Sequence, residues 1–330
     1  MLIEKIIQIC IARSSLLHIL YSFYGEVLKG YFTYKRLKQK TDGAKIFLQY
    51  YQGTGDVYLS SAYMKYCEQG QSKIENAVFA VNGTNAYKVA SLLEIRNVPI
   101  IKLTKKEAYS LVHLTRFIGQ ANIDITYLHY MSDYPMYTCF LIKLAGLHGI
   151  GFMDLYRDFV FCGEVFDLPI PQWESCESVV NHERKVLLAP AANSIAEGPA
   201  DSFWRRLAVE LKLQGYEVYT NVAGGEEPIE GTKSVSIPYR KLASFLDNKT
   251  IFIGYRSGLC DLVAPLKCKK IIIYPNSSWP LNDGLGIGST LDIFSLNKMG
   301  ICGDAIEVEY CAADESDILF RILREIADCY

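Results

Sequence analysis

Short apolar runs alternate with amphipathic segments along the first half of the chain. Four of the runs have the length and composition of buried parallel strands: residues 44–50, 77–81, 99–103 and 123–128. Four segments between or after them are predicted to be helices: residues 57–69, 85–96, 105–117 and 136–147. Because parallel strands need helical crossovers, this alternation predicts a parallel sheet covered by helices on both faces.

The same alternation restarts after a polar interruption. Residues 163–183 contain Pro169 and Pro171 and then several Glu and Ser residues, so this stretch is predicted to be a linker. Beyond it, strands are predicted at 185–189, 216–222, 234–237, 250–254 and 269–274. Helices are predicted at 201–214, 239–246, 258–266 and 314–329. The fold class that fits is two doubly wound α/β domains with a cleft between them.

Composition and charge narrow the class of protein. At 330 residues the chain exceeds the ~150 residues of a typical domain, which favours two domains. A hydrophobic content of 50% and a charged content of 21% are ordinary for a soluble globular protein. The formal net charge of −2 gives no basis for nucleic-acid binding. The 10 cysteines lie singly with no C-x-x-C pair, which predicts reduced thiols in a cytoplasmic protein rather than a zinc site or disulfides.

The N-terminal segment, residues 1–40, joins an apolar helix to a basic cluster. Its longest uncharged run, residues 14–25, is shorter than the ~20 residues that cross a bilayer. The cluster that follows consists of Lys35, Arg36, Lys38 and Lys40. Such a helix can lie on an anionic membrane surface. The alternative is a helix that packs on its own domain or on another subunit.

The first motif that contains candidate catalytic or binding residues is Gly53-Thr54-Gly55-Asp56, which lies between a predicted strand and a predicted helix. Its two glycines permit a sharp turn, and the helix behind it offers free N–H groups and the positive end of a dipole. Asp56 then stands at the crevice where α/β proteins bind ligands, and its carboxylate can act as a general base. The alternative role for Asp56 is a helix N-cap.

The second motif, Gly254-Tyr255-Arg256-Ser257-Gly258, follows a buried strand in the second domain. Ser257 and the N–H groups from Gly258 onward can bind an anion at a helix start, and the planar guanidinium of Arg256 suits phosphate. Asp261 falls in the first turn, where it either contacts a ligand or complements the dipole. The alternative role for Arg256 is a surface salt bridge.

Two polar loops at the same sheet edge add further candidates for nucleotide contacts. They contribute Asn193, Ser194 and Glu226, although ordinary loop polarity would produce the same residues. The chain lacks a Walker A sequence, a complete dinucleotide fingerprint and a G-x-S-x-G elbow. It also lacks an Asp-x-Asp motif, so no metal site and no cofactor are predicted.

The two motifs resemble those of the ADP-heptose:lipopolysaccharide heptosyltransferases and their relatives. Residues 55–61 resemble the G-D-hydrophobic-hydrophobic segment at the start of that family's sequences. Residues 254–266 resemble its G-x-D-[ST]-G-x-x-H-x-x-A-A-L segment. Arg256 stands where the family has Asp, and Asp261 stands where it has His. The resemblance implies a GT-B fold of two Rossmann-like domains, with metal-independent transfer, inversion at the anomeric carbon and Asp56 as the base. The two departures indicate a donor other than ADP-heptose.

With this resemblance the chain divides into five parts. A helical segment at 1–40 precedes an acceptor domain at 41–165, a linker at 166–184, a nucleotide-sugar domain at 185–313 and a C-terminal helix at 314–330. Gly53, Thr54 and Gly55 would line the acceptor side. Arg256, Ser257, Gly258 and the dipole behind them would stabilise the leaving diphosphate. The expected partners are a nucleotide-sugar and a glycan or lipid-linked glycan.

The predicted function is an inverting, metal-independent glycosyltransferase that builds a bacterial capsule, O-antigen or lipopolysaccharide. The expected location is the cytoplasm, in part on the inner face of the membrane. Two alternatives remain: a sugar-nucleotide epimerase or pyruvyl transferase on the same scaffold, or a non-catalytic subunit that binds a sugar nucleotide. Donor turnover without an acceptor would indicate the epimerase, and binding without transfer would indicate the subunit.

Overall fold

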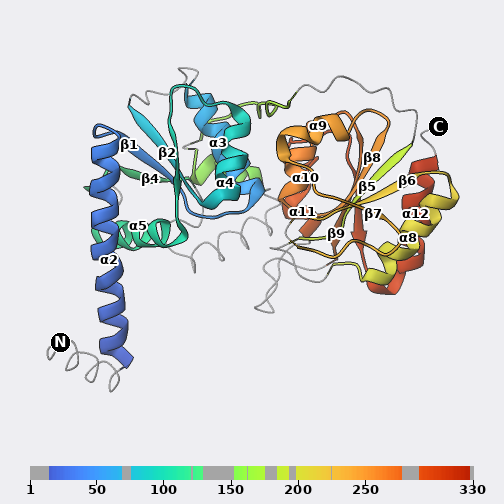
Figure 1. Cartoon of the computed structure of the whole chain (residues 1–330), viewed down its shortest axis with the longest axis horizontal. Coiled ribbons are helices and arrows are strands. Elements are labelled where there is room, and N and C mark those ends of the chain that lie inside the picture. Colours follow the sequence, from blue (N-terminus) through green and yellow to red (C-terminus); the bar gives the residue numbers. More distant parts are fainter. Residues whose placement is uncertain are drawn as a thin grey trace.

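The chain forms two α/β lobes that lie side by side (Figure 1). The computed structural model describes residues 15–68, 76–119, 122–128, 152–161, 163–174, 184–192, 198–223, 225–276 and 290–327. The N-terminal lobe has a four-stranded sheet of order β3-β2-β1-β4, and the C-terminal lobe has a six-stranded sheet of order β10-β9-β8-β5-β6-β7. Adjacent strands are parallel in both sheets, and both orders are those of a Rossmann-like, doubly wound fold. The predicted fold class is confirmed.

Alternate residues of the N-terminal sheet face two different cores. The strands are β1 (Lys45–Gln49), β2 (Ala77–Asn82), β3 (Ile100–Leu103) and β4 (Ile125–Tyr127). The helices are α2 (Ser15–Lys40), α3 (Thr54–Tyr66), α4 (Gly83–Ala90), α5 (Lys105–Ile118) and α7 (Phe152–Phe159), with a 3₁₀ turn η2 (Ser91–Leu93). Because side chains alternate along a strand, Phe47 packs with α3 and α4, whereas Ile46 and Leu48 pack with α5 and the end of α2.

The C-terminal sheet is buried in the same way. Its strands are β5 (Lys185–Ala189), β6 (Glu217–Asn221), β7 (Lys233–Val235), β8 (Thr250–Tyr255), β9 (Lys269–Pro275) and β10 (Ile306–Tyr310). Its helices are α8 (Asp201–Leu213), α9 (Leu242–Phe245), α10 (Gly258–Val263), α11 (Thr290–Phe294) and α12 (Glu315–Ala327), with 3₁₀ turns η4 (Tyr239–Lys241) and η5 (Ala312–Asp314). Val186 and Leu188 of β5 pack with α8 and α12, and Leu187 faces the opposite core.

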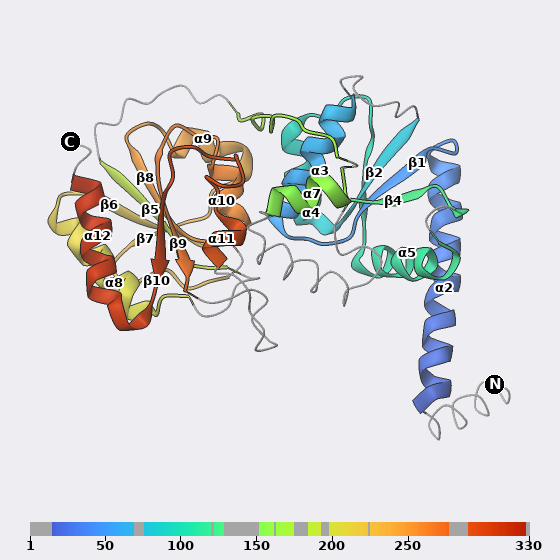
Figure 2. The same ribbon diagram turned by 180° about the vertical axis from the view of Figure 1, so that it is seen from behind.

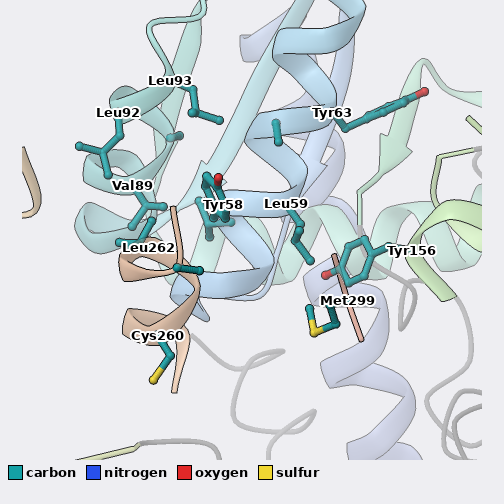
Figure 3. Close-up of a cluster of buried hydrophobic side chains, with 14 of the residues drawn as sticks. Tyr58, Leu59, Tyr63, Val89, Leu92, Leu93, Tyr156, Cys260, Leu262 and Met299 are labelled. Atoms are coloured by element: carbon teal, nitrogen blue, oxygen red, sulfur yellow. The ribbon is translucent and has the colours of Figure 1, made fainter. Parts of the chain in front are cut away.

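One apolar core crosses from lobe to lobe. Side chains of α3 and α4 pack in the same cluster as those of α10, and Figure 3 draws part of it, with Tyr58 and Leu59 from α3 and Cys260 and Leu262 from α10. Tyr58 is 1% exposed, and its hydroxyl donates to the carbonyl of Pro169 in the connecting segment, 2.9 Å away. The segment between the lobes is therefore attached to the core that joins them.

The element predictions differ from the structure at particular places. The strand β10 and the helices α7 and α11 were not predicted, while the helix predicted at 136–147 lies outside the described residues. The helix expected from residue 57 begins at Thr54, which places Asp56 inside its first turn. The helix expected at 258–266 ends at Val263. The domain boundaries predicted at 40, 165, 184 and 313 stay predictions.

The helix α2 lies along the edge of the N-terminal lobe that is remote from the C-terminal lobe. Figures 1 and 2 show its first half extending beyond the rest of that lobe, and α5 crossing it near its middle. The crossing is close because a Cβ at Gly30 would collide with the carbonyl oxygen of Ser110 and lie 2.8 Å from the Cβ of Leu114. No helix among the described residues has the length and apolarity that crossing a membrane requires.

Candidate functional site

A cavity of about 670 Å³ opens between the lobes. Residues that follow β1, β2, β5, β6 and β8 line it, so it lies outside the carboxyl ends of strands in both sheets. In the N-terminal sheet the strand order reverses at β1, and in the C-terminal sheet it reverses between β5 and β8. This is the crevice in which doubly wound folds bind ligands.

The two motifs predicted from the sequence meet in this cavity, although about 200 residues separate them in the chain. The predicted residues in its wall are Gly53, Thr54, Gly55, Asp56, Glu226, Arg256, Ser257, Gly258 and Asp261. Asn193 and Ser194 lie outside the described residues. The convergence of the two motifs follows from topology, because the carboxyl ends of parallel strands share one edge of a sheet.

Two glycines bring the lobes into contact beside the cavity. A Cβ at Gly258 would lie 2.6 Å from the backbone nitrogen of Gly55, and a Cβ at Gly55 would collide with Oδ2 of Asp261. Neither contact could persist with a larger residue, so the glycines are required here for close approach and not for an unusual φ. The first turns of α3 and α10 therefore touch, and each motif forms part of the other's environment.

Asp56 lies in the first turn of α3 and not at its N-cap. The N-cap of this helix is Gly53, and no side-chain capping hydrogen bond forms there. Oδ1 of Asp56 accepts a hydrogen bond of 2.9 Å from the hydroxyl of Tyr156. The N-cap role considered from the sequence is therefore wrong, because the helix begins two residues before Asp56; a favourable interaction with the helix dipole remains.

Tyr156 was missed in the sequence and is a buried partner of the candidate base. It lies on α7, it is fully buried, and it is 100 residues from Asp56 in the chain. One turn earlier on α7, Phe152 lines the cavity and packs on Phe294 of the C-terminal lobe, with 4.9 Å between ring centroids. Two aromatic residues at i and i+4 indicate only a buried helix face, so the sequence held no signal for this hydrogen bond.

Arg256 is held entirely by protein acceptors. Its side chain is 6% exposed and forms a two-pronged pair with Asp261, at 2.7 Å from Nη2 to Oδ1 and 3.2 Å from Nη1 to Oδ2. Nε donates to the carbonyl of Phe294 at 3.0 Å, and Nη1 also donates to that of Ser257 at 2.7 Å. The remaining hydrogen of Nη2 faces Sδ of Met299 at 4.0 Å, which accounts for all five N–H groups of a guanidinium. The surface salt bridge considered from the sequence is thus a buried one.

The opposite charges of Arg256 and Asp261 compensate each other, so the buried pair has no net charge. Burial opposes the charge of Arg256, but the Asp261 carboxylate overcomes this and raises the pKa of Arg256 above its usual value. Burial raises the pKa of Asp261, and the guanidinium counteracts that rise. A direct contact between Arg256 and a bound diphosphate stays a prediction, and it requires the guanidinium to give up one of these acceptors.

Glu226 has an identifiable local role, and Cys260 of α10 is a buried thiol. Oε2 of Glu226 accepts a hydrogen bond of 2.7 Å from the backbone of Ala223, so this carboxylate closes its own turn while it lines the cavity. Burial raises the pKa of the Cys260 thiol, which disfavours a reactive thiolate. Among the described residues no group of His, Cys, Asp and Glu could hold a metal ion.

The fold is similar to that of two solved heptosyltransferase structures. The E. coli heptosyltransferase WaaC with ADP is 12% identical, with a TM-score of 0.50 and a match that covers 86% of this chain and 99% of that one. The E. coli ADP-heptose lps heptosyltransferase II is 14% identical, with a TM-score of 0.54 and coverage of 86% and 98%. No family model matches the chain, and no curated protein matches it. At this identity the likeness shows a shared GT-B fold.

Proposed function

We propose that this chain is a glycosyltransferase that moves a sugar from a nucleotide-sugar to a hydroxyl group of a glycan, in the synthesis of a bacterial surface polysaccharide. The observation that carries the proposal is the meeting of Asp56 from one lobe with the Arg256–Gly258 loop from the other in a single cavity. The fold supports it, because the WaaC structure that shares this fold was solved with ADP. The Arg256–Asp261 pair, at two positions where the resembled family has Asp and His, supports a donor other than ADP-heptose.

In the proposed reaction Asp56 takes the proton of an acceptor hydroxyl while its oxygen attacks the anomeric carbon of the donor. The bond from that carbon to the diphosphate oxygen breaks, and the diphosphate leaves with the electron pair. Attack from the N-terminal lobe on a donor held by the C-terminal lobe inverts the anomeric centre. Ser257, the N–H groups from Gly258 onward and Arg256 stabilise the negative charge that develops on the leaving group, in place of a metal.

The first test is a thermal-shift screen of nucleoside diphosphates and their sugars. A ligand at 100 times its dissociation constant adds about 2.7 kcal/mol of stability, which gives a clear rise in melting temperature. The nucleotide-sugar found in this way is then assayed for transfer in a metal chelator, and NMR identifies the anomer of the product. We expect transfer without metal and with inversion. Donor turnover without an acceptor would instead indicate an epimerase, and binding with no transfer would indicate a non-catalytic subunit.

Tyr156 is proposed to hold the Asp56 carboxylate in the orientation that receives the proton. Tyr156→Phe removes one hydrogen bond to a charged group and is expected to lower kcat about tenfold, with little change in KM for the donor. Tyr63→Phe is the matched control, since Tyr63 is also buried and aromatic but stacks on Phe161 instead. A kcat for Tyr156→Phe equal to that of the parent, or an equal fall in kcat for Tyr63→Phe, would contradict the positioning role.

The proposed acceptor is a glycan, and a lipid-linked one would require the enzyme to work at a membrane. Residues 1–40 are proposed to make this contact from the cytoplasmic side, through an apolar helix and its basic end. The first half of α2 extends beyond the N-terminal lobe (Figure 2), and the basic end of the helix lies against that lobe, where Lys38 pairs with Asp124.

A further inference from the structure

The large exposed apolar side chains are concentrated on two helices. Of the 12 among the described residues, six lie on α2 and α5, and the other six are spread over the rest of both lobes. The six are Tyr24, Leu28, Tyr31, Phe32, Tyr109 and Phe117. Single exposed apolar residues are normal on a protein surface, but a group on adjacent elements indicates an interaction site.

Contacts between the two helices make these residues one surface, here called the α2–α5 surface. The rings of Tyr24 and Phe117 meet edge to face, with 5.9 Å between centroids. Leu28 and Phe32 follow Tyr24 at intervals of four residues, so all three lie along one face of α2. Ser110 of α5 donates a 2.6 Å hydrogen bond to Glu26 of α2. The helices therefore present their apolar side chains together and not as two separate patches.

The same two helices carry a strong positive charge. They contain eight Lys and Arg residues and two Glu residues, which gives a formal net charge of +6. The whole chain has a net charge of −2, so the rest of the molecule carries −8. Both acids are already engaged, Glu26 with Lys29 and Glu107 with Arg36. The basic side chains on α2 remain accessible to solvent: that of Lys29 is 68% exposed and that of Arg36 is 59% exposed.

We propose that the α2–α5 surface lies on an anionic lipid bilayer. Tyr, Phe and Leu side chains enter the headgroup layer, while the lysines around them reach the lipid phosphates and keep their aliphatic stems on the apolar boundary. The net charge of −8 on the rest of the chain is repelled by the same bilayer, which orients the molecule with this surface towards the lipid. A second copy of the chain fits less well, because a symmetric pair would place two surfaces of +6 against each other.

This inference rests on the membrane contact proposed above and names the surface that makes it. It adds α5, which lies outside residues 1–40, and it assigns the apolar part of the binding to particular side chains. It does not depend on which sugar the cavity takes. A failure of sugar transfer and a failure of lipid binding are therefore separate results.

The test is sedimentation of the full-length protein with vesicles of phosphatidylethanolamine and phosphatidylglycerol, compared with vesicles of phosphatidylcholine. We expect binding to the anionic vesicles, and Phe32→Ser or Phe117→Ser should each weaken it about tenfold or more. Phe320→Ser on α12 is the matched control, since Phe320 is 68% exposed and Phe32 is 67% exposed. The control should bind as the parent does.

The charge contribution is tested with Lys29→Gln and Lys35→Gln, each expected to weaken binding about fivefold at low salt, because a surface lysine adds about 1 kcal/mol.

Four results would overturn the proposal. They are equal binding to neutral vesicles, no loss with Phe32→Ser, a fall of several degrees in the melting temperature of Phe32→Ser, or a dimer that Phe32→Ser dissociates in sedimentation velocity. The third would mean that the protein itself covers this face, and the fourth that a second copy does.

Discussion

Asp56→Asn is expected to lower the turnover number of sugar transfer by about 10²-fold or more while nucleotide binding stays nearly unchanged. The amide has the shape of the carboxylate, and its oxygen can still accept the hydrogen bond from Tyr156, so the geometry of the site is retained. What the substitution removes is the ability to take a proton. Single-turnover kinetics with saturating donor and acceptor measure the chemical step, and calorimetry measures the affinity for the nucleoside diphosphate.

Asp154→Asn is the matched control for this variant. Asp154 lies on α7, two residues before the Asp56 partner Tyr156, but its carboxylate pairs with Arg157, 2.7 Å away. We expect the control to turn over as the parent does. A turnover for Asp56→Asn within a few-fold of the parent would reduce Asp56 to a favourable charge near the N-terminus of α3, worth about 0.3–1 kcal/mol of stability.

Much of the fold could be predicted because burial imposes a pattern on the sequence. The strands β1, β2, β5, β8 and β9 are buried on both faces, so each is a continuous apolar run that stands out from the helices around it. The strand β10 was missed because it lies at a sheet edge, where Glu307 and Glu309 alternate with apolar residues. Alternation over five residues is weak evidence beside the long helix that follows.

The position of the site could be predicted, but the pairing of its side chains could not. Strand order brings the Asp56 and Arg256 motifs to facing edges, and a sequence that alternates strands and helices contains this information. Hydrogen-bond partners depend on differences of a few tenths of an ångström in the spacing between elements that are far apart in the chain. The Tyr156–Asp56 contact is of this kind. Arg256 and Asp261 are only five residues apart, yet each was assigned a separate ligand role, because the sequence does not show that a strand end and a helix turn face each other.

The Arg256–Asp261 pair gives the two departures from the heptosyltransferase pattern a common explanation. The family segment has Asp and His at these two positions, whereas this chain has a cation at the first and an anion at the second. Either change alone would leave a buried charge without compensation. The two together restore a neutral pair with 6% of each side chain exposed. The departures are therefore coupled, and they should be tested as a pair.

Arg256→Ala is expected to weaken nucleoside diphosphate binding by roughly ten- to a hundredfold, which corresponds to the free energy of one charge-assisted hydrogen bond. Two physical causes predict this loss. In the first, Arg256 exchanges an acceptor for the diphosphate and contacts it directly. In the second, Arg256 only neutralises Asp261, and its removal leaves a buried carboxylate that repels the ligand. Since unpairing a buried charge costs about 3–5 kcal/mol of folding stability, melting temperatures are measured before affinities.

The double variant Arg256→Ala with Asp261→Asn separates the two causes, and calorimetry with the free nucleoside diphosphate measures both variants. Removing both charges leaves no carboxylate to repel the ligand, so neutralisation as the cause predicts that affinity returns to that of the parent. Direct contact predicts that affinity stays low, and that Arg256→Lys restores only part of it, because an ammonium group cannot make a two-pronged contact. Asp261→Asn alone should then bind the diphosphate at least as tightly as the parent, since the amide keeps one acceptor and frees one of the two N–H groups of Arg256 that Asp261 holds. If all of these variants bind as the parent does, the diphosphate does not lie beside Arg256 and the proposed donor site is wrong.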